Sequence, residues 1–127
     1  MPSVAEVYRS LPRLIDRAMK KRCAEAIQNL KGELIDSMKA AAKSTESLPM
    51  SFTATHGVPS SDLEFMQATY TSQKMRELFG FDYDDNVEVD CDVGMRRMEA
   101  FLCSVGMITV TLTPDRKQHR VPEDEAQ

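Results

Sequence analysis

The sequence predicts a two-layer α+β domain, in which a long N-terminal amphipathic helix, preceded by a short one, packs with a small three-stranded sheet and two further helices. Between Ile15 and Ala41, apolar residues recur every three or four positions, which is typical of a helix with one buried face. Three shorter segments alternate apolar and polar residues, which is typical of strands with one buried face. Glycine and proline separate these segments, as expected for turns between elements.

We expect the elements in the order ααβαβαβ. Ser3 and Glu6 form a capping-box pattern that predicts a short first helix from Val4. Pro12 is expected to open the long second helix, which runs to about Thr45. The remaining elements are expected as strands over 50–55, 87–93 and 107–113 and as helices over 62–79 and 94–105. The strand–helix–strand unit at the end predicts a right-handed βαβ crossover.

The length of 127 residues corresponds to one domain that buries its own core. We place this domain at 1–113, with an N-terminal helical arm at 1–47, and a polar C-terminal tail at 114–127. No apolar run approaches the roughly 20 residues of a membrane span, and the first residues lack the basic-then-apolar pattern of a secretory signal, so we expect neither.

Three cysteines, Cys23, Cys91 and Cys103, are scattered along the chain without a CxxC pair or zinc-like spacing. An odd, scattered set favours a reducing intracellular compartment, most simply the cytoplasm. We expect buried thiols without redox or zinc chemistry, with Cys91 and Cys103 inside the core, and we predict no cofactor.

Charge is distributed unevenly along the chain, whose formal net charge is −4. Residues 1–43 sum to +4, whereas residues 44–113 sum to −7. The sequence therefore predicts a basic helical part joined to an acidic body, and complementary charge of this kind orients partners during association.

The apolar stripe of the long helix is longer than a three-stranded sheet needs to cover. Such an excess indicates a partner helix, either from a second copy of the chain or from a larger complex. We therefore predict self-association through residues 12–45. The predicted interface residues are Ile15, Met19, Ile27, Leu30, Leu34 and Met38.

An acidic pattern marks the middle strand, where Glu88, Asp90 and Asp92 share one face. The acid–apolar–acid pattern resembles the metal-binding strand of nucleotidyltransferases and small primase-like folds, and this resemblance implies divalent metal ions and phosphoryl transfer. The resemblance covers four or five residues, and the second motif that those families need is not found in the sequence. The favoured interpretation is a solvated acidic face, with the metal site kept as an alternative.

A basic stripe follows the first part of the helical region, with Arg9, Arg13, Arg17, Lys20 and Lys21 at helical spacing. It is suited to the phosphates of nucleic acid or to anionic lipid, although the acidic protein as a whole (pI about 5.2) weighs against strong nucleic-acid binding. The favoured interpretation is a solvated helix face, or one that pairs with the protein's own acidic body. His56 is expected in a loop after the first strand, without a sequence-marked catalytic partner.

These patterns favour a non-enzymatic interaction or assembly protein that binds a protein partner through its long helix. Two alternatives remain open at this point. One is a metal-dependent phosphoryl-transfer or nucleic-acid enzyme that uses Glu88, Asp90 and Asp92. The other is a nucleic-acid-binding accessory protein that uses the basic stripe.

Overall fold

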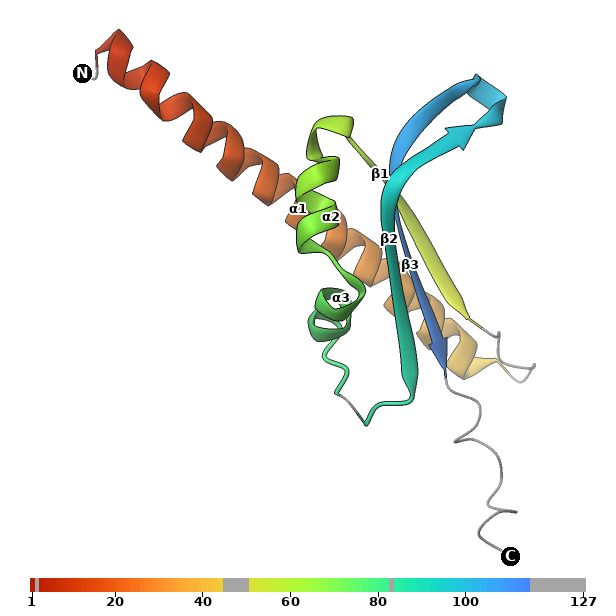
Figure 1. Cartoon of the computed structure of the whole chain (residues 1–127). Coiled ribbons are helices and arrows are strands. Elements are labelled where there is room, and N and C mark those ends of the chain that lie inside the picture. The colour runs from red at the N-terminus through yellow and green to blue at the C-terminus, as the bar shows by residue number, and fades with distance from the viewer. Residues whose placement is uncertain (2, 45–50, 83, 115–127) are drawn as a thin grey trace, which may run out of the picture.

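A computed structural model describes residues 1, 3–44, 51–82 and 84–114 of the chain. One long helix, α1 (Val4–Lys43), lies across one face of a three-stranded sheet, and two short helices complete the same layer (Figure 1). The predicted two-layer α+β class is therefore confirmed. The predicted tail lies outside the described residues except for Pro114, which is the last residue of a strand.

Helix α1 is a single helix and not the two that Pro12 was expected to separate. It begins at the predicted capping box, where Ser3 Oγ accepts a hydrogen bond from Glu6 N (3.3 Å) and Glu6 Oε2 accepts one from Ser3 N (3.3 Å). Pro12 lies inside the helix, where it removes one backbone donor. At about 1.5 Å per residue, its 40 residues extend roughly 60 Å, which is longer than the sheet beneath.

The sheet has the order β1-β3-β2 and is antiparallel throughout. Its strands are β1 (Phe52–Val58), β2 (Val87–Met98) and β3 (Cys103–Pro114). The expected loop at His56 is wrong, because His56 pairs with Ile108 inside β1. All three strands appear where the alternating segments predicted them, but each is longer than expected.

The helix predicted over 94–105, and with it the βαβ crossover, is not present. Residues 94–98 instead continue β2, and Gly94 pairs with Met107 while Met98 pairs with Cys103. A short 3-10 turn, η2 (Glu99–Phe101), and Leu102 in the left-handed region (φ 51°) join the two strands as a hairpin. The apolar spacing in this short segment fits a helix or a strand, and pairing along β3 decides for the strand.

The helix predicted over 62–79 is divided into α2 (Leu63–Thr69) and α3 (Ser72–Leu78), preceded by a 3-10 turn, η1 (Ser60–Asp62). The break follows from local capping, since Thr71 adopts an extended conformation and its Oγ1 accepts a hydrogen bond from Lys74 N (3.1 Å). Consequently α2 and α3 pack against β2 as separate elements.

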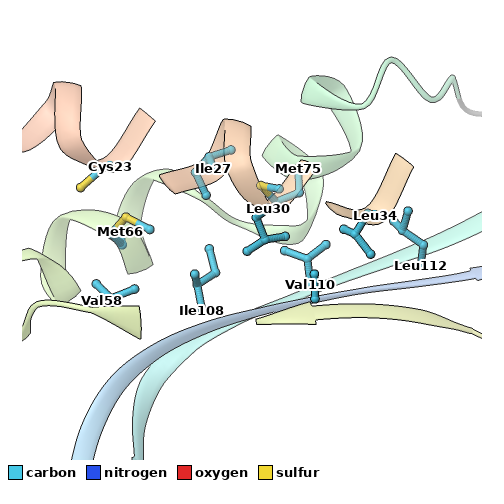
Figure 2. Packing of buried hydrophobic residues seen from close by; sticks show 11 residues of the cluster. Cys23, Ile27, Leu30, Leu34, Val58, Met66, Met75, Ile108, Val110 and Leu112 are labelled. Atoms are coloured by element: carbon cyan, nitrogen blue, oxygen red, sulfur yellow. The ribbon is translucent and has the colours of Figure 1, made fainter. Parts of the chain in front are cut away.

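The core lies between α1 and the sheet, with α2 and α3 closing one side (Figure 2). Apolar side chains from four elements meet there, and each is at most 2% exposed. They are Ile27, Leu30 and Leu34 of α1, Met66 of α2, Met75 of α3, and Ile108, Val110 and Leu112 of β3. Because side chains alternate along a strand, the opposite face of the sheet carries the threonines of β1 and β3 and the acidic residues of β2.

Gly106 in β3 allows the closest approach of β1. A Cβ atom built there lies 2.3 Å from the carbonyl oxygen of Val58, whereas one built at Gly94 meets nothing within 4 Å. We predict that Gly106→Ala lowers the free energy of unfolding by about 1–3 kcal/mol, because β1 must shift. Gly94→Ala is the matched control and should be neutral or stabilising by up to about 1 kcal/mol. Urea unfolding measures both, and equal effects of the two variants would contradict this packing.

Candidate interaction surface

The N-terminal part of α1, residues 4–18, projects past the sheet as a helical arm (Figure 1). The large apolar side chains on this projecting arm are between 38% and 72% exposed. They are Val4, Val7, Tyr8, Leu11, Leu14 and Ile15. A contiguous exposed apolar stripe of this kind marks a binding surface on a folded protein.

The stripe on the projecting arm and the buried stripe further along α1 face different directions. Successive helical residues turn by about 100°, so the arm stripe centred near Leu11 is rotated by roughly a third of a turn from the stripe around Leu30. The arm stripe is therefore not an extension of the face that packs on the sheet. A different surface is needed to cover it.

The predicted basic stripe places Arg9, Arg13 and Arg17 on the side of the projecting arm opposite its apolar residues. Its other two members, Lys20 and Lys21, lie beyond the arm, and all five are exposed. Lys20 forms an ion pair with Asp16 (2.9 Å). Within the described residues, no ion pair involves Arg9, Arg13, Arg17 or Lys21. The arm is therefore amphipathic, with an apolar face and a basic back.

The six predicted interface residues fall into three groups. Ile27, Leu30 and Leu34 are buried in the core of their own chain, so in this fold they are not available to a partner. Met19 and Met38 are half-buried and pack on the edge of that core. Only Ile15 is exposed (66%), and it belongs to the stripe on the projecting arm.

Most of the exposed stripe was not predicted from the sequence, because it lies on both sides of Pro12, whose pattern predicted a helix boundary. The signal was present, since Val4, Tyr8, Leu11 and Ile15 are separated by four, three and four residues. That spacing is the seam of a coiled coil, and it is visible once the helix is taken as continuous.

Glu88, Asp90 and Asp92 lie exposed on the face of the sheet away from the helices. Their partners across the sheet are Thr113, Thr111 and Thr109, so no acid from another strand stands opposite them. Asp92 instead forms an ion pair with Arg96 on the same strand. Among the residues that the structure describes, no group of three or more histidine, cysteine or acidic side chains is placed to hold a metal ion.

A half-buried ion pair joins α1 to η1, with Asp62 buried and Arg22 partly exposed. No pattern in the sequence indicates it, because Arg22 and Asp62 are 40 positions apart. Asp62 is 2% exposed and receives two hydrogen bonds from one guanidinium, from Arg22 Nε to Oδ2 (3.1 Å) and from Arg22 Nη2 to Oδ1 (2.8 Å). The hydrogen bonds from Arg22 lower the pKa of Asp62 below its ordinary value. The bidentate pair therefore fixes the point at which α1 leaves the body of the protein.

A half-open hollow of about 360 Å³ lies beside this ion pair, lined by residues that include Arg22, Cys23, His56 and Asp62. Two of its polar side chains are engaged within the chain, since Asp62 is held by Arg22 and His56 Nδ1 donates to the Gly57 carbonyl (2.8 Å). Burial raises the pKa of the Cys23 thiol, which keeps it protonated and weakly nucleophilic. We therefore assign the hollow no chemistry.

The three cysteines are free, as expected, but they are not all buried. Cys23 is buried, and Cys91 is half-buried with its pKa raised by burial to about 11. The prediction that Cys103 is buried is wrong, because it opens β3 next to the hairpin turn and is exposed.

Comparisons with known proteins give no relative from which a role can be transferred. No family model, no curated protein and no solved structure matches the chain. Within the described part of the chain, no helix combines the length and the apolar character needed to cross a membrane. The function must therefore be argued from the surfaces themselves.

The Arg22–Asp62 pair makes stability depend on pH in a defined direction. Because the folded pKa of Asp62 is lowered, its contribution is present above the ordinary aspartate pKa of about 3.9 and is lost as pH falls through the folded value. We predict that Asp62→Asn lowers the free energy of unfolding by about 1–2 kcal/mol at pH 7, and that its deficit relative to the native chain shrinks below about pH 4.

Asp90→Asn is the matched control, because it changes an exposed carboxylate on the open face of the sheet. It should alter the unfolding free energy by less than about 0.5 kcal/mol at either pH. Thermal melts followed by circular dichroism at pH 7 and pH 3 measure both variants. An Asp62→Asn protein as stable as the native chain at pH 7 would contradict the role given to the ion pair.

Proposed function

We propose that this protein is a non-enzymatic interaction or assembly protein that docks onto a partner helix through the projecting arm of α1. The observation that carries the proposal is the exposed apolar stripe on the arm, which no part of the described chain covers. The partner helix belongs to a second copy of the chain or to a larger complex.

The spacing of the stripe supports a helical partner. Val4, Tyr8, Leu11 and Ile15 recur in the four–three–four pattern with which two helices interlock. Val7 and Leu14 widen the same face. A helical segment of about two heptads is only marginally stable by itself in water, so the arm needs its partner to bury this surface.

Charge supports a particular orientation of that partner. The arginines of the projecting arm lie on its back, away from the seam, and so do not oppose one another when two apolar faces meet. An acidic flank on the partner would be attracted to them and would accelerate association. The acidic strand of this protein offers one such flank in a second copy.

A nucleic-acid-binding role is the second candidate, and the specific observation that favours it is the exposed row of Arg9, Arg13 and Arg17 without ion-pair partners in the described chain. Phosphate contacts need only such a row of cations. This role leaves the apolar face of the projecting arm unexplained, so we place it second. The metal-dependent enzyme is not proposed, because its acids face threonines and not further acids.

Two double variants separate these roles while changing the net charge equally. Leu11→Asp with Ile15→Asp places two charges in the apolar seam and should weaken association with the partner helix at least tenfold, which is about 1.4 kcal/mol. Arg13→Gln with Arg17→Gln removes two charges from the opposite side and should leave protein association within about twofold. Both pairs are exposed, so the melting temperature of the body should not change.

Sedimentation equilibrium of the purified chain, and of the chain with its co-purifying proteins, measures association. Fluorescence anisotropy with a labelled oligonucleotide measures nucleic-acid binding. Association with the partner helix that is unchanged in the Leu11→Asp, Ile15→Asp variant would remove the proposal. Oligonucleotide binding that is abolished only by the arginine variant would move the second candidate to first place.

A further inference from the structure

The two edge strands of the sheet are protected very differently. β1 packs against α1, and β2 packs against α2 and α3. Among the described residues, however, helix side chains hydrogen-bond to outward backbone groups of β2 and not to those of β1. Arg76 donates to the carbonyl of Val87, Gln67 Nε2 donates to the carbonyl of Val93, and Ser72 Oγ accepts from Cys91 N. Such coverage prevents another strand from pairing with β2 along this stretch.

The same hydrogen bonds, together with the strand register, indicate which backbone groups of β1 face outward. In an antiparallel sheet, the N–H and C=O of one residue point to the same side of the strand, and successive residues alternate between the two sides. In β2, the backbone groups of residues 87, 91 and 93 therefore point away from β3, and those of residues 88, 90 and 92 bond to it. These bonds use residues 113, 111 and 109 of β3. The intervening residues of β3 therefore bond to β1.

On β1, that leaves the outward groups of Thr53, Thr55 and Gly57. The carbonyl of Gly57 accepts from His56 Nδ1, at 2.8 Å. For Thr53 and Thr55, no hydrogen bond within the described residues uses the outward N–H or C=O. Figure 1 shows β1 at the margin of the molecule, with no further strand beside it.

The composition of β1 also leaves this edge open. Its seven residues, Phe52 to Val58, contain no Lys, Arg, Asp, Glu or Pro, and their register with β3 is unbroken by a bulge. Natural edge strands usually carry a charge, a proline or a bulge that opposes pairing. β1 has no charged residue, proline or bulge, whereas side chains from α2 and α3 hydrogen-bond to the edge of β2.

We propose that β1 is a docking edge for β1 of a second copy, giving a continuous six-stranded antiparallel sheet. The occupant is a second copy because the outward-facing residues, Thr53, Thr55 and Gly57, are symmetric about Thr55. With a twofold axis at Thr55, the Thr55 residues face each other and Thr53 faces Gly57 of the partner copy, forming up to about six backbone hydrogen bonds. An uncharged strand pairs with itself without like charges opposite each other.

This edge is separate from the projecting arm, so the inference goes beyond the proposed function and does not depend on it. The arm extends from the end of the helical layer, whereas β1 borders the sheet (Figure 1). A dimer through β1 leaves both arms free for their partners. It thereby makes the assembly bivalent, which strengthens binding to a multivalent partner.

The experiment is done in the full-length chain that carries Leu11→Asp and Ile15→Asp, so that the arm does not contribute to association. Sedimentation equilibrium should show that this chain still dimerises. Adding Thr55→Pro removes one outward N–H without removing a bond to β3, and should raise the dimer Kd at least tenfold, about 1.4 kcal/mol. Adding Thr55→Val keeps the backbone groups and should leave the Kd within about twofold.

A charge pair tests the twofold axis without relying on proline. Thr55→Lys and Thr55→Glu place like charges opposite each other, so each alone should dimerise at least tenfold more weakly. An equimolar mixture of the two should recover dimer, because opposite charges then meet. Thr55 is exposed, so both variants should keep the fold and its circular dichroism spectrum.

Two results would overturn the inference. One is an arm-disabled chain that remains a monomer at several hundred micromolar. The other is a dimer whose Kd is unchanged by Thr55→Pro and by either charged variant. If the unmodified chain associates, the first of these results would at the same time support the proposed function.

Discussion

The packing of the middle of α1 onto the sheet is the contact on which the rest of the structure depends. Ile27, Leu30 and Leu34 share one buried cluster with Ile108, Val110 and Leu112, and all six are at most 2% exposed. A fully buried aliphatic side chain contributes about 1.5–3 kcal/mol, so these side chains make a large favourable contribution to the fold. The Arg22–Asp62 pair then fixes where α1 leaves this core.

Once the middle of α1 is fixed on the sheet, its length determines which surfaces remain. The sheet covers little of the helix before Met19, so the first four turns extend into solvent. The apolar stripe of that projecting arm faces a different direction from the buried stripe, and no bending of the arm toward the sheet would bury it without also twisting the helix. The chain therefore presents one covered apolar face and one exposed apolar face on a single helix.

The sequence predicted the class, the layers and the positions of the three strands, because period and alternation report directly which face is buried. It failed where a local pattern fitted two structures. The segment 94–105 has helical spacing over too few residues to compete with pairing along β3, and Thr71 divides a helix that looked continuous. Pro12 caused the opposite error, because it predicted a helix boundary whereas α1 continues through it as one helix. The Arg22–Asp62 pair could not be predicted, because only the folded chain brings those two positions together.

We propose that α1 is one helix with two roles, a core-building segment and an arm that binds a partner. The decisive measurement is backbone hydrogen exchange along α1 in the full chain, at low and high concentration and with the co-purifying partner. We expect amides around Leu30 to be protected under all conditions, and amides around Leu11 to exchange fast in the isolated chain and to become protected with the partner. Equal protection of both segments in the isolated monomer, or an arm that stays unprotected in every complex, would contradict it.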